Sequence, residues 1–268
     1  MKKSVAFCIA GLSLFAQHVR AENTFCLVEG AGSPSLSPYE IISSWSEVVE
    51  TISSASKTKY VIQHFISFDS IEKVFKNKTC TVALVKPIQY AALAMRDSGY
   101  QMVTSIKGEF IGNFIVRAND TRMKAISDLG GKTIMLPDPK ALQSLLAKRE
   151  LKQLKIVPSP EIKHTRLQEV VLYAVEKGFV DAGFVNPTMA KVWAEKGGKV
   201  LYKTKPNPYW VIIASKEVSE KEIVAMREGL LKLERTDKGA ASLAKIGIKG
   251  FESNDKTLYL KLLEDLNS

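Results

Sequence analysis

SIEKVFKNKTCTVALVKPIQYAALA, at Ser70–Ala94, shares its layout with VVLYAVEKGFVDAGFVNPTMAKVWA, at Val170–Ala194. Each stretch begins with an amphipathic segment, continues with an apolar run and a proline, Pro87 or Pro187, and ends in a second helix-like segment. The apolar runs predict buried strands, and each proline marks the loop after its strand. Two α/β units of matched design indicate a two-lobed ligand clamp rather than an enzyme with a single active site.

Strand and helix signals alternate along the rest of the chain as well. This alternation predicts an α/β fold, in which mainly parallel sheets carry helices on both faces. Ligands bind to such sheets outside the carboxyl ends of the strands. We therefore expect the ligand site in the loops that follow the predicted strands, namely Glu29–Ser35, Ser67–Asp69, Lys86–Tyr90, Pro137–Lys140 and Asn186–Thr188.

The first 21 residues have the pattern of a secretory signal peptide. Lys2 and Lys3 precede an apolar run, Val5–Phe15, and Val19 and Ala21 are small residues at the −3 and −1 positions of a cleavage site. The apolar run is too short to span a bilayer, and the sequence has no second run of that kind long enough to do so. We expect a mature chain that starts near Glu22 and is soluble in the periplasm.

The composition is that of an ordinary globular protein, with 46% apolar and 25% charged residues. The signal segment carries Lys2, Lys3 and Arg20 and no acidic residue, so its removal lowers the net charge from +10 to +7. A moderately basic exported protein either favours anionic ligands or is simply made soluble by its charge. Export and the lack of a basic–aromatic motif argue against nucleic acid as a partner.

Two cysteines, Cys26 and Cys80, remain in the mature chain, and each lies at the start of an apolar strand-like run. If these runs are adjacent parallel strands, the two side chains come within reach of a disulfide, which the exported compartment permits. Two buried thiols and a redox pair are the alternatives.

The sequence carries no pattern typical of an enzyme. His64 and His164 lack the spacing of a zinc site, and the chain has no nucleophile elbow, P-loop or paired-carboxylate motif. We expect a binding protein without catalytic residues, metal or cofactor.

Four passages resemble one family. Ser127–Pro139, SDLGGKTIMLPDP, is similar to a strand entry of the phosphate-, phosphite- and phosphonate-type periplasmic binding proteins. His164–Asn186 resembles their helix–strand unit, with Gly178, Asp181 and Gly183 in register. The tail at Leu233–Lys261 and the loop at Lys86–Tyr90 resemble two further motifs of that family, so the likeness spans nearly the whole mature chain.

The resemblance implies a type II periplasmic-binding-protein fold with two crossover hinge strands. It places residues 22–109 and 208–268 in one lobe and residues 110–207 in the other, with hinges at 110–117 and 200–210. The sequence departs from the family after Pro139, where the expected hydroxyl cluster is replaced by Lys140-Ala141-Leu142-Gln143-Ser144. A bare helix N-terminus and Lys140 remain there to attract an anion.

The candidate ligand contacts are drawn from the strand-end loops and from positions that match the family. Tyr39, Tyr90 and His164 match family positions, while the others stand at strand ends or at the second crossover, where Trp210 adds a second ring. Packing, capping or an exposed rim is the alternative role for each. The candidates are Tyr39, Lys86, Gln89, Tyr90, Asp138, Lys140, His164, Asn186, Thr188 and Tyr209.

The resemblance implies a solute-binding protein of an ABC-type uptake system, which closes on a small, anionic ligand and delivers it to a membrane permease. We expect this protein to be a monomer. The alternative is a periplasmic sensory or accessory module, which reports the same kind of ligand to a membrane receptor or an assembly partner.

Overall fold

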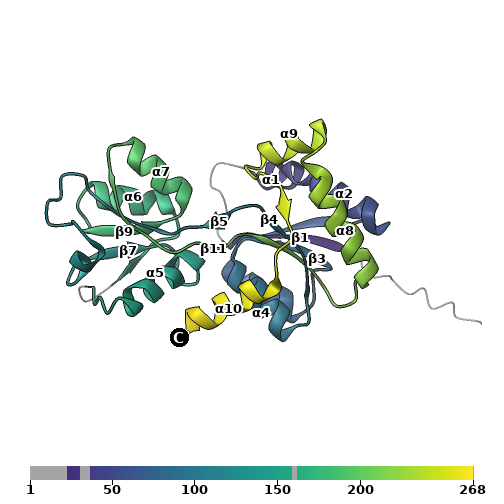
Figure 1. The fold of residues 1–268 in the computed structure, drawn as a ribbon, viewed down its shortest axis with the longest axis horizontal. Coiled ribbons are helices and arrows are strands. Elements are labelled where there is room, and N and C mark those ends of the chain that lie inside the picture. The colour runs from purple at the N-terminus through teal and green to yellow at the C-terminus, as the bar shows by residue number, and fades with distance from the viewer. Residues whose placement is uncertain (1–22, 31–36, 159–161, 268) are drawn as a thin grey trace, which may run out of the picture.

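The computed structural model describes residues 23–30, 37–158 and 162–267. These residues form two lobes that lie side by side along the long axis of the molecule (Figure 1). We call the half built on a six-stranded sheet the first lobe and the half built on a five-stranded sheet the second lobe. The predicted signal segment lies outside the described residues. Among the helices that the structure describes, none is long and apolar enough to cross a membrane.

The sheet of the first lobe has the strand order β13-β4-β12-β3-β1-β2. Strands β1, β2, β3 and β4 run in one direction, while β12 and β13 run antiparallel to their neighbours, so the sheet is mixed. The strands are β1 (Thr24–Val28), β2 (Val61–Phe65), β3 (Val82–Val85), β4 (Gln101–Ile106), β12 (Val211–Ala214) and β13 (Phe251–Glu252).

Helices cover both faces of this sheet because its central strands are apolar on both sides. Along β1, Phe25 and Leu27 face a core shared with α1, α2 and α8, whereas Cys26 and Val28 face a core shared with α3, α4 and α10. The helices of this lobe are α1 (Pro38–Ser44), α2 (Ser46–Ser56), α3 (Phe68–Lys76), α4 (Ile88–Asp97), α8 (Glu220–Leu233), α9 (Asp237–Lys245) and α10 (Lys256–Asn267).

The sheet of the second lobe has the order β10-β6-β9-β7-β8, and only β6 runs against the other four strands. Helix α5 packs on one face and helices α6 and α7 on the other. The elements are β6 (Asn113–Val116), a 3₁₀ turn at Ile126–Leu129, β7 (Ile134–Leu136), α5 (Leu142–Gln153), β8 (Lys163–His164), α6 (Gln168–Glu176), β9 (Ala182–Val185), α7 (Pro187–Glu195) and β10 (Lys199–Lys203).

Two short strands, β5 (Glu109–Phe110) and β11 (Asn207–Pro208), pair where the chain crosses between the lobes (Figure 1). Next to this pair, Gly112 and Thr204 exchange two hydrogen bonds, from Gly112 N to Thr204 Oγ1 and from Thr204 N to Gly112 O, both 2.9 Å long. The two crossover segments are thus tied together as one connection.

The strands before the two prolines have matching neighbours. In the first lobe, β3 lies between parallel β1 and antiparallel β12; in the second lobe, β9 lies between parallel β7 and antiparallel β6. Strands β12 and β6 each follow a crossover. Pro87 then serves as N-cap of α4, and Pro187 begins α7. The shared layout of Ser70–Ala94 and Val170–Ala194 therefore marks equivalent places in the two lobes.

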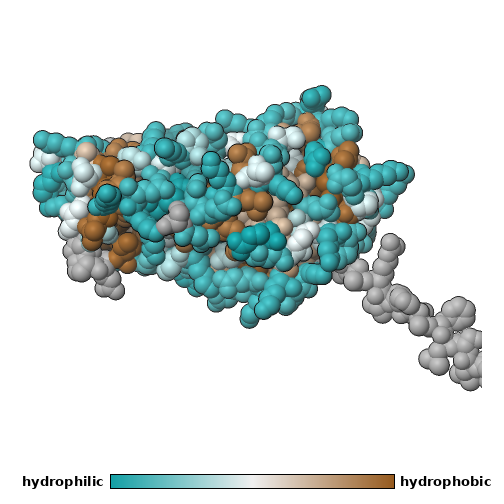
Figure 2. Space-filling model, turned by 60° about the horizontal axis from the view of Figure 1, so that its bottom comes forward, coloured by the Kyte–Doolittle hydropathy of each residue, from teal (hydrophilic) through white to brown (hydrophobic). Residues whose placement is uncertain are grey.

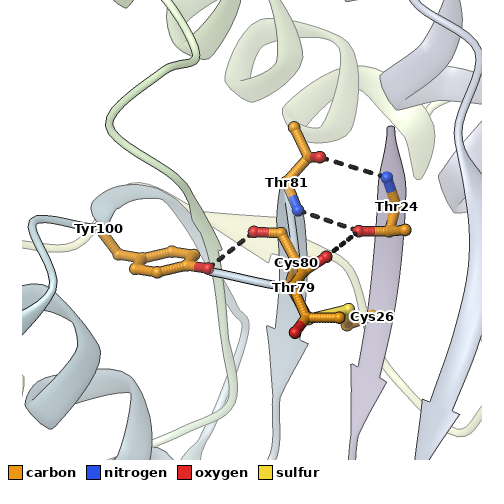
Figure 3. The surroundings of a disulfide bond; sticks show 6 residues. All are labelled: Thr24, Cys26, Thr79, Cys80, Thr81 and Tyr100. Atoms are coloured by element: carbon orange, nitrogen blue, oxygen red, sulfur yellow. Dashed lines mark hydrogen bonds between the residues drawn. A yellow bond between two sulfur atoms is a disulfide. The ribbon is translucent and has the colours of Figure 1, made fainter. Parts of the chain in front are cut away.

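A disulfide joins Cys26 on β1 to Cys80 just before the parallel neighbour β3, with a Cα–Cα distance of 5.8 Å (Figure 3). Thr24 Oγ1 donates to Thr79 O at 2.7 Å and accepts from Thr81 N at 3.1 Å, which holds the two chain segments in register. The hydroxyl of buried Tyr100 donates to Cys80 O at 2.7 Å. The bridge is therefore part of a dense hydrogen-bonded junction.

Candidate binding cleft

A cavity of about 570 Å³ lies between the lobes, at the carboxyl ends of strands from both sheets. All five predicted strand-end loops reach it, although residues 31–35 of the first loop lie outside the described residues. It also takes in the loop after β8, the two crossover segments and the loop after α9. Of the candidate contacts, the ones that line the cavity are Lys86, Asp138, Asn186, Thr188 and Tyr209.

The wall of the cavity on the first lobe is organised around Glu29. The residues after β1 and β3 continue the sheet ladder, because Glu29 N donates to Phe65 O at 3.0 Å and Lys86 N donates to Val28 O at 2.9 Å. This ladder brings the Lys86 ammonium onto Glu29 Oε1, while His64 Nε2 lies 2.5 Å from Glu29 Oε2. The Glu29 carboxylate is thus largely buried, with 9% of the side chain exposed, and is held by two partners from neighbouring strands.

Gly30 lets the chain turn directly after Glu29. Its φ of 77° is in the region that favours glycine, and an added Cβ would meet the ring of Phe68 and the side chain of Pro87. Glycine at this position allows the loops after β1 and β3 and the start of α3 to meet at the cavity.

Aromatic rings complete the same wall. The Lys86 ammonium lies 4.4 Å from the ring centroid of Trp210 and 6.0 Å from that of Trp45. The rings of Trp210 and Tyr209 stack with centroids 4.7 Å apart, and Tyr209 O accepts from the hydroxyl of Tyr259 at 3.1 Å. Burial raises the pKa of the Tyr209 phenol. Lys86 is therefore held by a carboxylate and by a rigid aromatic pair.

The opposite wall, on the second lobe, is built from loop residues and helix starts. Asn186 caps α7, since its Oδ1 accepts from Met189 N at 2.8 Å, and its backbone N–H donates to Gln168 Oε1 at 2.8 Å. Thr188 is exposed at the cavity. Asp138 Oδ1 accepts from the backbone N–H of Lys140 at 2.8 Å. This wall offers amide, hydroxyl and carboxylate groups to a ligand.

Helix α5 starts at this wall without a side-chain cap, and Ala141, Leu142 and Gln143 line the cavity. Ser144, one position further, is fully buried, and its hydroxyl donates to Pro137 O at 2.9 Å. The N–H groups in the first turn of α5 therefore receive no side-chain cap, and Ser144 is not among the residues that line the cavity.

The remaining candidate contacts lie away from this cavity. Tyr39 is 79% exposed on α1. His164 Nδ1 is 2.7 Å from Pro137 O; because a carbonyl only accepts, this nitrogen carries the hydrogen, and the ring fixes the loop after β7. The last three candidates, Gln89, Tyr90 and Lys140, line a separate groove.

This rear groove, of about 940 Å³, lies among α3, α4, α5 and α10. Lys140 Nζ lies 2.8 Å from Asp69 and 3.1 Å from Glu72, and Lys140 O accepts from Gln89 Nε2 at 3.0 Å. Burial raises the pKa of Tyr90 to about 12. Figure 2, which brings this side forward, shows hydrophobic atoms at the surface in the middle of the molecule among mainly hydrophilic ones. Lys140 here connects the two lobes.

Comparison with known proteins decides the family. A model of the family described as ABC transporter, phosphonate, periplasmic substrate-binding protein matches residues 31–259. The chain belongs to this family. Its members are substrate-binding proteins rather than enzymes, and they bind a small molecule and work with a membrane permease. A search of curated protein sequences finds no match.

Solved structures show the same type II fold. XAC2383 of Xanthomonas citri, bound to chloride, has a TM-score of 0.75 at 16% identity and covers 92% of this chain and 98% of its own. PhnD1 of Prochlorococcus marinus, in complex with methylphosphonate, has a TM-score of 0.72 at 12% identity, covering 91% and 97%. A binding protein component of an ABC phosphonate transporter from Pseudomonas aeruginosa has a TM-score of 0.68 at 15% identity, covering 91% and 85%.

The cleft of this family member also contains charged residues that were not among the candidate contacts. Glu29, Glu109 and Glu169 line it beside Asp138, and Arg166 joins Lys86 as a second cation. Glu29 lies in a predicted strand-end loop, and Arg166 follows the short strand β8, so the strand-end rule points to both once these strands are known. Within the described part of the chain, no group of histidine, cysteine and acidic side chains is arranged to hold a metal ion.

Proposed function

We propose that this protein is the substrate-binding protein of an ABC uptake system and that it closes on a small oxyanion-bearing ligand in the cavity between its lobes. The observation that carries the proposal is Lys86, whose ammonium is fixed at the cavity wall by Glu29 and Trp210. An ammonium has three N–H donors, so those not directed to Glu29 remain for a ligand. The membership of a phosphonate-binding family supports an anion as the ligand.

The proposed contacts are the residues that the cavity brings together. Lys86 and Arg166 attract the charged oxygens, the uncapped start of α5 donates backbone hydrogen bonds, and Asn186, Thr188 and Tyr209 contact the neutral part of the ligand. Methylphosphonate in the Prochlorococcus protein and chloride or ATP in the Xanthomonas protein are anionic ligands of related folds. We do not include Tyr39, Gln89, Tyr90, Lys140 or His164 in the proposed site.

We further propose that residues 1–21 direct export to the periplasm, and that residues 22–109 with 208–268 move against residues 110–207 about the pair β5 and β11. Closure of two lobes around a ligand is the usual mechanism of such proteins. The protein then presents its ligand to a membrane permease as a monomer.

A thermal-shift screen of phosphate, phosphite, methylphosphonate, sulfonates and amino acids tests the proposal. A ligand at 100 times its dissociation constant stabilises the folded state by about 2.7 kcal/mol. Lys86→Met is expected to weaken binding of the best anion by about 10- to 100-fold, because a hydrogen bond to a charged group is lost. Lys191→Ala, on the exposed side of α7, is the control. If no anion stabilises the protein, the proposed function is wrong.

A further inference from the structure

The surroundings of the Lys86 ammonium have the composition of a binding site for a ligand cation. Trp210 and Trp45 present rings 4.4 Å and 6.0 Å from the nitrogen, and the Glu29 carboxylate contacts it directly. Proteins bind ammonium groups of ligands with aromatic rings and carboxylates arranged in this way. In this chain, Glu29, Trp45 and Trp210 form a cage of this kind, and the cation inside it is the ammonium group of Lys86.

The walls of this cage are held by contacts that do not involve Lys86. Glu29 is fixed by His64 and by the backbone ladder to β2. Trp45, between α1 and α2, is 3% exposed and packs in the core of the first lobe. Trp210 stacks on Tyr209 with an angle of 14° between the rings. We therefore expect that a shorter side chain at position 86 leaves Glu29, Trp45 and Trp210 in their places, with an unfilled space between them.

We propose that Lys86 occupies a cation cage formed by Glu29, Trp45 and Trp210, and that the residue at position 86 determines whether this wall of the cleft accepts an anion or a cation. With lysine, the charge of Glu29 is neutralised and the remaining N–H groups face an anion. Without it, the Glu29 carboxylate, which lines the cavity, and the two tryptophans accept an ammonium group from a ligand. The statement that Lys86 binds an anion rests on the proposed function. The statement that the cage binds a cation when Lys86 is shortened does not.

A surface site on the second lobe also joins a lysine, a glutamate and an aromatic ring, here a single tyrosine, and serves as an exposed control. Lys177 Nζ lies 3.0 Å from Glu176 and 5.8 Å from the ring centroid of Tyr173, but all three residues are about half exposed to solvent. Water competes for an ammonium there, so Lys177→Ala is expected to create no measurable cation site.

The test is chemical rescue with n-propylammonium chloride, because Lys86→Ala removes the atoms of that molecule from the side chain. Binding is followed by isothermal titration calorimetry and by tryptophan fluorescence, with n-propanol and sodium chloride as controls for the apolar chain and for ionic strength. Lys86→Met is the second variant: it fills the cage with an uncharged chain. Circular dichroism verifies that each variant is folded.

We expect Lys86→Ala to bind n-propylammonium at least about tenfold more tightly than the unchanged protein does. The same difference is expected relative to Lys86→Met and to Lys177→Ala. About tenfold is within the range that a desolvated cation–π contact contributes to affinity. Adding Glu29→Gln to Lys86→Ala is expected to abolish the gain. If folded Lys86→Ala gains no affinity for the ammonium, or if the unchanged protein binds it equally well, the cage proposal is overturned. If the unchanged protein binds no anion but Lys86→Ala gains affinity for n-propylammonium, the proposed function is wrong and the cage proposal is still supported.

Discussion

The Nζ atom of Lys140 lies 2.8 Å from the Oδ1 atom of Asp69, so an ion pair links the second lobe to helix α3 of the first lobe. Glu72 accepts from the same ammonium at 3.1 Å. Hydrogen bonds to both carboxylates raise the pKa of the Lys140 ammonium above its usual value. The pair favours the arrangement of the lobes seen here, in addition to the crossover strands.

We therefore expect Lys140→Ala to loosen the lobes without unfolding either of them. The ion pair is exposed and is screened by salt, so its loss is expected to change the relative position of the lobes more than the melting temperature. Small-angle X-ray scattering of the ligand-free variant is expected to give a larger radius of gyration. Lys191→Ala, which removes an ion pair within α7, is expected to leave the scattering unchanged. Identical scattering of both variants would contradict a role in lobe arrangement.

Removing the disulfide is expected to lower stability strongly. Cys26 and Cys80 are separated by 54 residues, and the chain-entropy model assigns about 4 kcal/mol to closing a loop of that length. Urea unfolding of the double variant Cys26→Ala/Cys80→Ala measures the loss, and the unchanged protein in reductant is expected to unfold at a similarly low midpoint. Mass spectrometry without reductant provides the direct check: alkylation of both thiols in native protein would show that no bridge forms.

Asp120 is expected to make the second lobe sensitive to acid. The Arg122 guanidinium donates to its two oxygens at 2.8 and 2.6 Å and lowers the pKa of this buried carboxyl from 3.8 to about 2. A folded-state pKa below the unfolded value gives stability that is present above pH 4 and is lost as pH falls towards 2. The contribution is about 2 kcal/mol.

The variant Asp120→Asn keeps the shape of the side chain and removes its titration. Urea unfolding at pH 5 and at pH 2 is expected to show a smaller difference for this variant than for the unchanged protein, by roughly the 2 kcal/mol assigned to the carboxyl. An equal pH dependence in both proteins would mean that the Arg122 contact does not contribute to acid stability.

A side chain at Gly112 is expected to destabilise the protein, because a Cβ there would overlap the ring of Phe184. Gly112→Ala therefore overpacks the core beside the crossover and is expected to cost about 1–3 kcal/mol. The double variant Gly112→Ala/Phe184→Leu is expected to be more stable than the sum of the two single changes predicts, since the smaller side chain removes the overlap. Additive effects in thermal or urea unfolding would refute a direct clash.

The fold was predictable from sequence to the extent that its signals are local. The apolar runs before Pro87 and Pro187 are central strands in both lobes, and each proline stands at a helix start. The antiparallel placement of β12 and β6 was not predictable in the same way. It depends on pairing with strands far away in the chain, and no local pattern sets that direction.

The cleft was predictable where a residue directly follows a buried strand, as Lys86 and Asn186 do. Lys140 was assigned to the ligand on the basis of the helix start that it precedes, but its position is decided by Asp69 and Glu72, which are about 70 residues away in the sequence. The importance of Glu29 was not visible either, because its partners His64 and Lys86 reach it only once β1, β2 and β3 lie side by side.

The C-terminal helix α10 touches parts that the proposed closure would move against one another. It packs on α4 of the first lobe and on α5 of the second, and its Tyr259 hydroxyl is hydrogen-bonded to Tyr209 beside the crossover. A fluorophore attached to an exposed α10 residue such as Lys261 would thus sense a change in its surroundings whenever the lobes shift. A dye on α10 would therefore report ligand binding through the movement of the lobes, without entering the cleft. The protein could serve in this way as the scaffold of an optical biosensor.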